Sequence, residues 1–541
     1  MIKVETRAAV PERYRAGFET LTGPASRALL SFLASDFLEG REAGSRGYRL
    51  AAEYAASLFA LWRIEPAGDS GGDGARSYLQ EVVMKEYTGL GCTLSWQGSQ
   101  ESAGGGRVFH EGVDLENYYR NRIPETLTAP VVFAGYGIRE DSIGYDDFAK
   151  LDVKGRIVMI LDGVPGRDDP ASPFMKADLA EKYKGFRSFI GPLNKAAEVA
   201  KLGPVAVLVV RDDMKDGDIY DQMGPAAESD ERPLITEPSR LCTLPGAKRE
   251  GGAIFITREA ADVLLSSSGR NIEGLRARIK SDWKPASLEI AGGKLTIRTT
   301  AECERLLRCH NVVGFIPGSD PKLKDETVTI GAHLDHLGRR DRYVFNGADD
   351  NGSGAAGVLA IARAIAGLPV KPKRTIVFCL WTGEELGMLG SSAYIRKPAF
   401  PLSRAAAYLN LDMIGRTYDE ESLKARMRRL KVPAEAQKNI SADNFAVVAF
   451  AAGRGLGEIL RQADQTIGID LWPQAEAVVK SSGIVSDYLP FAAAGVPYLY
   501  WAGVMHADYH QTGDEAAKIN PEWMARIIRL VYLTAAALAD R

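Results

Sequence analysis

The spacing of apolar positions divides this chain into an α/β part and a β-rich part. From Asn311 to the end, short apolar runs typical of buried strands alternate with segments whose apolar residues recur at helical spacing. The predicted strands are NVVGFIPG, TVTIGAH, RTIVFCLW, AAAYLNLD, FAVVAFAA and VPYLYWAG, and the last predicted helix is EWMARIIRLVYLTAAALAD. Alternation of this kind predicts an α/β fold with helices on both faces of a central sheet.

The middle of the chain has a different texture. Between about Thr126 and Pro285, β-rich runs such as GRIVMILDG and PVAVLVVRD are separated by turns, with one clear helix at NKAAEVAKLG. Next, SLEIAGGKLTIRTTAE predicts a hairpin around Gly292-Gly293. We therefore expect residues 1–125 and 287–541 to form one domain, with residues 126–286 as a compact β-rich insert.

Histidines and carboxylates gather where the predicted strands of the α/β part end. These residues are His333, His336, Asp349, Asp350, Glu384, Glu385, Asp412, His506 and His510. Imidazole and carboxylate ligands without thiolate suit zinc in a catalytic role, and manganese or cobalt less often. Two histidines with three carboxylates exceed what one catalytic zinc takes, and they suffice for two ions that share a bridging carboxylate.

Each of these motifs also has a structural interpretation. DDNGSG by itself is typical of a turn that caps the next helix, and Glu384-Glu385 is typical of a helix start, where the macrodipole favours anions. Asp412 is different, because a carboxylate directly after AAAYLNL should be buried and a buried charge requires a partner. The coincidence of all five motifs at strand ends favours a functional site.

Composition narrows the class of protein further. The chain has 541 residues, a net charge of -3 and 45% hydrophobic residues, which are the values of an ordinary globular protein. This charge gives no reason to expect nucleic acid or an anionic membrane as a partner, and no run approaches the roughly 20 apolar residues of a membrane span. The five cysteines lack CxxC spacing, so the pattern indicates neither a zinc ribbon nor a disulfide scaffold.

The strand-end motifs resemble those of the zinc aminopeptidase family that includes bacterial secreted aminopeptidases and glutamate carboxypeptidase. The similar stretches are GAHLDHLG, GADDNGSG, TGEELG, NLDMIG and YHQTGDE. The segment from VVFAGYGI through YDDFAKLDVKGRIVMILDG resembles the protease-associated domain inserted in many members. The resemblance covers most of the chain. It implies a three-layer α/β/α sandwich with a central mixed, mostly parallel sheet, plus the inserted β-rich domain at residues 126–286.

Carried over motif by motif, the resemblance implies a role for each site residue. The metal ligands would be His333 and Asp412 for one zinc, Glu385 and His510 for a second, and Asp350 as the bridge. Glu384 would be the general base, Asp335 the acid that orients the centre, and Tyr509 a group that polarises the substrate carbonyl. Asp487 and Asp514 would have supporting roles. His336 and His506 are not carried over as ligands, and His336 is expected to be a bystander.

The resulting expectation is a zinc-dependent exopeptidase acting on a peptide substrate, with two zinc ions as cofactors. An acidic centre favours the α-ammonium group of a substrate, so aminopeptidase is the leading specificity. The alternatives that stay open are a carboxypeptidase or dipeptidase on the same fold, a single-zinc glutaminyl cyclase and a non-catalytic binding protein. The oligomeric state also stays open.

The opening MIKVETRAAVPERYRAGFE lacks the apolar core of a secretory signal. Relatives of this architecture are usually exported, so we expect a periplasmic or secreted protein whose signal has been removed. A cytoplasmic protein fits the same sequence.

Overall fold

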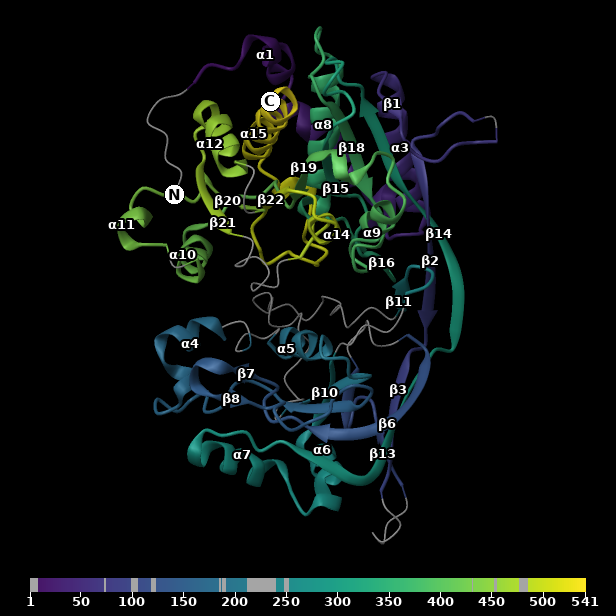
Figure 1. The fold of residues 1–541 in the computed structure, drawn as a ribbon. Helices are drawn as coiled ribbons and strands as arrows, with labels where there is room; N and C mark the ends of the chain where they lie inside the picture. Colours follow the sequence, from purple (N-terminus) through teal and green to yellow (C-terminus); the bar gives the residue numbers. More distant parts are fainter. Residues whose placement is uncertain are drawn as a thin grey trace. The chain divides into compact units, whose positions relative to one another are not determined.

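The computed structural model describes residues 8–72, 74–98, 106–117, 123–183, 186, 191–211, 240–247, 253–430, 432–451, 455–475 and 485–541. The described residues belong to two compact units (Figure 1). One unit comprises Met1–Met84 with Leu307–Arg541, and the other comprises Lys85–Met223 with Ile235–Leu306.

The first unit is built on a large mixed sheet, in which strands follow the order β14-β18-β15-β19-β22-β20-β21. Their bounds are β14 (Cys303–Ile316), β15 (Thr327–His333), β18 (Thr375–Trp381), β19 (Ala405–Asp412), β20 (Phe445–Phe450), β21 (Asp470–Ala475) and β22 (Tyr498–Ala502). β15 is parallel to β18 and β19, and β19 is parallel to β22. β14 and β20 are antiparallel to their neighbours β18 and β22. The structure confirms the six strands predicted after Asn311 and a mixed α/β fold.

Every residue of β15 and β18 is buried. The apolar run TIVFCLW predicts this for a central parallel strand, whereas the alternating run TVTI predicts a strand without predicting burial on both faces. The helices of this unit are α1 (Glu12–Glu19), α2 (Gly23–Leu33), α3 (Arg46–Leu61), α8 (Gly354–Ala366), α9 (Leu389–Arg396), α10 (Glu420–Arg429), α11 (Ala434–Gln437), α12 (Leu456–Ile467), α14 (Tyr488–Ala493) and α15 (Pro521–Asp540). α8 and α15 both contact β15 and β19, whereas α14 contacts β19 and β22. α8 lies close to its neighbours because it is rich in small residues: a Cβ on Gly357 would lie 3.0 Å from Leu411.

The second unit has its own sheet, in the order β4-β3-β13-β6-β9-β10-β12-β5. Its strands are β3 (Gly91–Gln97), β4 (Arg107–His110), β5 (Leu115–Asn117), β6 (Glu125–Phe133), β9 (Ile157–Leu161), β10 (Ala206–Arg211), β12 (Ala253–Thr257) and β13 (Leu288–Thr300). β6, β9, β10 and β12 are parallel, and the other pairings are antiparallel. The helices are α4 (Ala177–Lys182), α5 (Gly191–Ala200), α6 (Arg258–Leu265) and α7 (Ile272–Asp282).

The hairpin predicted around Gly292-Gly293 is wrong. β13 is one strand that pairs with β3 on one side and with β6 on the other, so the chain does not reverse at the glycines. Instead, the register against β6 shifts between Glu289 and Lys294, and Gly292 has φ +75°. An irregularity within a strand can use the same positive φ that a tight turn requires, so a glycine pair alone does not distinguish the two.

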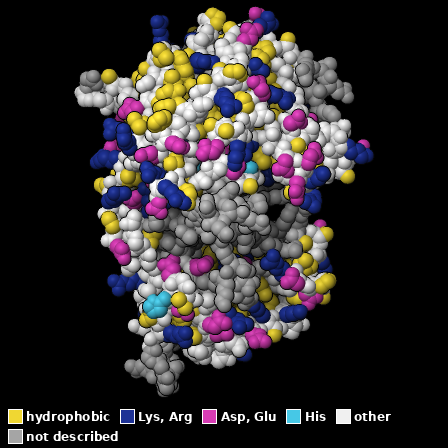
Figure 2. Space-filling view, turned by 180° about the vertical axis from the view of Figure 1, so that it is seen from behind, with side chains coloured by type: hydrophobic (Ala, Val, Ile, Leu, Met, Phe, Trp, Pro, Cys, Tyr) yellow, Lys and Arg dark blue, Asp and Glu magenta, His cyan; other side chains and the backbone are white. Residues whose placement is uncertain are grey.

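Acidic and basic side chains are interspersed over the described part of the face in Figure 2, without a broad field of one sign. This agrees with the small net charge of -3. Among the described residues, no helix is long and apolar enough to cross a membrane.

Candidate metal centre

The predicted site residues follow the carboxyl ends of neighbouring strands in the first unit. His333 is the last residue of β15 and Asp412 is the last residue of β19. Glu384 and Glu385 follow β18, and His510 lies eight residues beyond the end of β22. Because these four strands are parallel, their carboxyl ends share one edge of the sheet, where ligand sites of α/β proteins are found.

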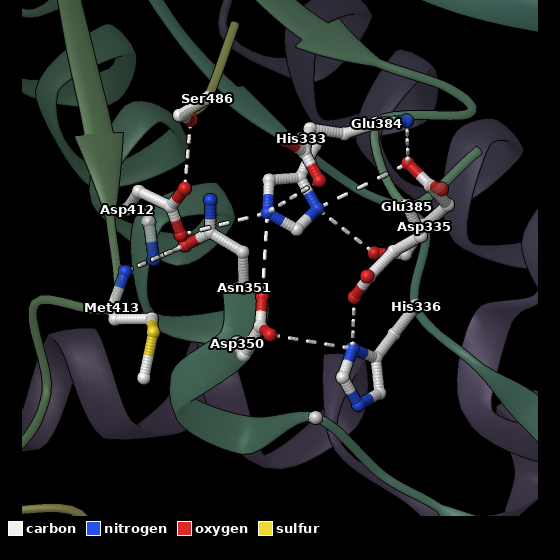
Figure 3. Close-up of polar contacts among 12 residues, drawn as sticks. His333, Asp335, His336, Asp350, Asn351, Glu384, Glu385, Asp412, Met413 and Ser486 are labelled. Atoms are coloured by element: carbon white, nitrogen blue, oxygen red, sulfur yellow. Dashed lines mark hydrogen bonds and ion pairs between the residues drawn. The ribbon is translucent and has the colours of Figure 1, made fainter. Parts of the chain in front are cut away.

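Five of these side chains form two donor sets that share one carboxylate. In the first set, His333 Nε2 lies 3.3 Å from Asp350 Oδ1 and 3.5 Å from Asp412 Oδ1 (Figure 3). In the second set, His510 Nε2 lies 3.2 Å from Asp350 Oδ2 and 3.2 Å from Glu385 Oε2. Asp350 thus presents one oxygen to each imidazole.

The chemistry of these donors fits a metal centre. Donor atoms of His333, Asp350 and Glu385 all lie within 4.8 Å of one another, and nitrogen with carboxylate oxygen is the ligand set of catalytic zinc. Burial alone would raise the pKa of Glu385, yet His510 and His336 lower it to about 2. Burial likewise opposes charge on His510, but Glu385 and Asp350 raise its pKa to about 10. Buried carboxylates at this density therefore require positive charge beside them.

The loop that carries Asp350 is held by hydrogen bonds between side chains and backbone groups on several sides. Asn351 Oδ1 accepts the Gly354 and Met413 N–H groups, and Asn351 Nδ2 donates to Leu411 O at 2.9 Å. The N–H groups of Asp349 and Asp350 both donate to Asp514 at 3.0–3.1 Å. The GADDNGSG motif therefore does more than cap α8, because it ties the Asp350 loop to the segment after β19.

Glu384 lies beside the donor sets without belonging to either. Its Oε2 is 4.0 Å from His333 Nε2, and 13% of its side chain is exposed. Burial raises the pKa of Glu384 well above its usual range; His333 opposes this rise, whereas Asp487 and Glu385 add to it. A carboxylate in this environment holds a proton more readily than an ordinary glutamate does.

Asp335 supports both His333 and Glu384, partly through its backbone. His333 Nδ1 lies 3.1 Å from Asp335 O, whereas the nearer Asp335 carboxylate oxygen is 4.0 Å away. That oxygen, Oδ1, accepts the Glu384 N–H at 3.1 Å. Burial raises the pKa of Asp335 to about 6.

Asp412 is backed by a chain of buried side chains that the sequence did not reveal. Ser486 donates to Asp412 Oδ2 at 2.7 Å, and Asn410 Nδ2 donates to Ser486 at 2.8 Å. Asn410 in turn accepts the Tyr408 hydroxyl at 2.6 Å. Tyr408, Asn410 and Asp412 are each two residues apart along β19, so their side chains lie on the same face of the sheet. This two-residue spacing is the one signal in the sequence that could have predicted the row of hydrogen-bonded side chains.

The structure brings two further histidines to the carboxylates. His336 Nδ1 lies 2.7 Å from Glu385 Oε1, so a histidine that was expected to be a bystander contacts a predicted ligand. The contact arises because His336 follows β15 by three residues and so remains at the same sheet edge. His506 Nε2 lies 3.3 Å from Asp349 Oδ2.

The remaining predicted residues also lie near the centre. The Tyr509 ring stacks on His510 with centroids 3.9 Å apart, and burial raises the pKa of its phenol. Asp487 is fully buried and accepts the Ser391 hydroxyl, and burial raises its pKa to about 7. Asp514 acts on the Asp350 loop through the backbone hydrogen bonds described above.

The region that contains the two donor sets is similar to a family of known proteins. Residues 311–535 match peptidase family M28. Leupeptin-inactivating enzyme 1 of Streptomyces exfoliatus is 30% identical over 221 residues, 37% of this chain and 48% of that protein. A probable glutamate carboxypeptidase of Arabidopsis thaliana, AMP1, is 33% identical over 162 residues, 28% of this chain and 21% of that protein. The chain therefore spans about half or less of the length of these curated relatives.

Among solved structures, an aminopeptidase from Aneurinibacillus sp. strain AM-1 has a similar fold, with a TM-score of 0.50 and 19% identity. The match covers 98% of this chain and 96% of that one. Every member of the two donor sets lies between residues 311 and 535, the range over which this chain is similar to peptidase family M28.

Proposed function

We propose that this protein is a zinc-dependent exopeptidase that removes N-terminal residues from peptides. The observation that carries the proposal is the position of Asp350, whose two oxygens lie 3.3 Å and 3.2 Å from the imidazoles of His333 and His510. Each imidazole has a second carboxylate beside it, Asp412 or Glu385. Two complete three-donor sets that share a bridge are what a pair of metal ions requires.

In this proposal His333, Asp350 and Asp412 would hold one zinc, and His510, Asp350 and Glu385 would hold the other. When bound, the zinc pair supplies Lewis-acid activation of water and of a peptide carbonyl. Manganese or cobalt would bind the same nitrogen and oxygen donors. His336 donates to or accepts from Glu385 at 2.7 Å and so fixes the orientation of that ligand.

Glu384 is the proton carrier of the proposed reaction. Its carboxylate faces His333 from 4.0 Å, outside both donor sets, and can take a proton from the attacking water. The raised pKa of Glu384 favours retention of that proton until the leaving amine accepts it. Tyr509, stacked on His510, presents a phenol at the same edge that can donate a hydrogen bond to the substrate carbonyl.

The charges around the centre favour an α-ammonium group over an α-carboxylate. Arg41 and Arg416 are the arginines whose contacts reach this cluster in the described part of the chain, and each already binds protein oxygens, although the buried Nε of Arg416 makes no hydrogen bond. Arg41 donates to four backbone carbonyls, and Arg416 pairs with Asp508 at 3.0 Å and Asp514 at 3.5 Å. A carboxypeptidase needs an available cation for the substrate terminus, so this arrangement supports aminopeptidase specificity.

The test is a panel of aminoacyl chromogenic amides, each paired with its N-acetylated counterpart as a matched control. We expect turnover of the free amines only, its loss with a chelator and its recovery with zinc. Preferred cleavage of N-acylated dipeptides with a free C-terminus would indicate a carboxypeptidase instead. Cyclisation of N-terminal glutamine without hydrolysis would indicate a glutaminyl cyclase, and no turnover of any kind would indicate a binding protein.

We also propose that the β-rich segment at residues 126–286 is a protease-associated domain inserted into a three-layer α/β/α peptidase domain. Support comes from the resemblance of its sequence and from the separate sheet and core of the second unit. We further propose a periplasmic or secreted location. Removing residues 85–306, which span the second unit, and comparing the cleavage of short and long peptides would show whether that unit shapes access to the substrate.

A further inference from the structure

One buried arginine, Arg41, joins the N-terminal segment to the loop between His333 and Asp350. It is 1% exposed, and Nε donates to Leu334 O at 2.9 Å. Nη1 donates to Asn346 O at 2.7 Å and also to Leu33 O, and Nη2 donates to Gly347 O at 2.9 Å. Three of these four carbonyls belong to the loop, one next to His333 and two just before Asp350.

Two further hydrogen bonds join the segment around Arg41 to the same loop. Arg41 O accepts the His336 N–H at 3.2 Å, and Asp36 Oδ1 accepts from Asn346 Nδ2 at 2.7 Å. The short segment Asp36–Arg41 therefore contacts both ends of the loop, whose middle is the hairpin of β16 (Gly338–Arg340) and β17 (Tyr343–Phe345). Gly347 has φ +53°, and a Cβ there would lie 2.1 Å from Asp350 O, so the loop turns tightly at the point that Arg41 contacts.

A guanidinium group suits this position because it is planar and carries five N–H donors in a fixed geometry. Its hydrogen bonds to carbonyl oxygens compensate for the cost of burying the charge. Burial lowers the pKa of Arg41 to about 10, while Asp514 and Asp335 oppose that change, so the side chain stays charged at neutral pH. Lysine has three donors on one atom and cannot reach carbonyls spread over Leu334, Asn346 and Gly347 at once.

We propose that Arg41 is a positioning residue that sets the zinc affinity of the centre through the backbone next to His333 and Asp350. The inference rests on the proposed metal centre. Two effects of removing Arg41 oppose each other: loss of a positive charge near the carboxylates favours a cation, whereas release of the loop misplaces two ligands. The hydrogen bonds of Arg41 are to carbonyls and not to the ligand carboxylates, so we expect the positioning effect to dominate.

The expected size follows from other metal sites, where loss of a group that orients a ligand weakens binding about 10- to 100-fold. Arg41→Met should fall in this range, and Arg41→Lys, which keeps the charge and part of the contact, should fall between it and the unchanged protein. Zinc affinity is measured by competition with a chromophoric chelator, together with the unfolding transition of each metal-free protein. This readout needs no catalytic activity.

Arg374 provides a matched control in the same unit. It is 13% exposed, donates to Glu326 Oε2 at 2.7 Å and to Leu538 O at 3.0 Å, and precedes β18 at the opposite end of the strand from Glu384. Arg374→Met should lower the unfolding transition without changing zinc affinity. If Arg374→Met weakened zinc as much as Arg41→Met, general destabilisation would explain both results and the inference would be overturned.

Unchanged or tighter zinc binding by a folded Arg41→Met protein would also overturn the inference, since charge would then outweigh position. If Arg41→Met does not fold, Arg41→Lys decides: weaker binding supports the inference and wild-type binding overturns it. A wild-type protein that binds no zinc would overturn the proposed metal centre as well. Wild-type zinc binding with equal affinity in all variants would overturn the role of Arg41 alone.

Discussion

Replacing Glu384 by Gln separates the chemistry of the proposed site from its architecture. Glutamine has the shape of glutamate and lacks the charge and the proton-accepting carboxylate. The Glu384 N–H that donates to Asp335 belongs to the backbone and is retained in the variant. Neither donor set contains Glu384, so both should still bind zinc.

The expected loss is that of a general acid–base catalyst, about 100- to 10,000-fold in kcat. This corresponds to about 3–5 kcal/mol of transition-state stabilisation. KM should change little, because the proposed role of Glu384 is proton transfer and not substrate binding. The metal-free variant should also be more stable than the metal-free wild type at neutral pH. Burial raises the pKa of Glu384, so the folded state loses stability as pH rises above the unfolded value and the carboxylate ionises.

The assay combines steady-state kinetics on an aminoacyl chromogenic amide with elemental analysis of zinc. Glu385→Gln is the matched control, since the adjacent side chain belongs to a donor set and its replacement should lower the zinc content. Near-normal kcat in Glu384→Gln would refute the role of this residue. Loss of zinc equal to that of Glu385→Gln would show that Glu384 is itself a ligand.

Three further predictions concern metal, pH and packing. Asp350→Asn should weaken both zinc ions and Asp412→Asn mainly one, measured as zinc bound per protein after dialysis; equal stoichiometries would contradict the shared bridge. Burial raises the pKa of Asp147 to about 7, so the folded state binds more protons than the unfolded state between about pH 4 and 7. The free energy of unfolding should therefore fall across that window, by on the order of 4 kcal/mol, and Asp147→Asn should remove this dependence in urea titrations at several pH values. Phe491 is buried and its ring stacks on that of Tyr408, with centroids 3.9 Å apart. Phe491→Ala should lower the free energy of unfolding by about 3–5 kcal/mol, measured as a lower urea midpoint with an unchanged slope.

The strands of the α/β part could be predicted because burial on both faces imposes continuous apolar runs. β18 is of this kind, whereas β15 was recognised from the alternation of apolar and polar residues in its first half. The β16–β17 hairpin could not be predicted, because its strands are only three residues long, too short to show a pattern of apolar and polar positions. The hairpin predicted at the glycines of β13 was wrong for a different reason, since an irregularity within a strand and a tight turn both require a positive φ.

In the candidate site too, residues that end a recognisable strand could be predicted, whereas contacts between residues distant in sequence could not. His333 and Asp412 end buried strands, so their convergence follows from parallel pairing, although their roles as ligands stay predictions. His336 was set aside because motif matching ranks positions by likeness to relatives and contains no distances. Ser486 was missed because it lies twelve residues before the start of β22 and comes close to Asp412 only in the folded chain.

Arg41 is the clearest case of a residue that reaches the candidate site from a distant part of the sequence. The family match begins at residue 311, yet the guanidinium that contacts the loop between His333 and Asp350 belongs to Arg41, which lies 270 residues before that match. The helices α2 and α3 also contact α8, which follows that loop. The matched region therefore contains the proposed ligands without all the groups that position them. The N-terminal segment therefore supplies a group that contacts the loop between two proposed ligands, although no strand pattern or metal motif would have marked it as part of the site.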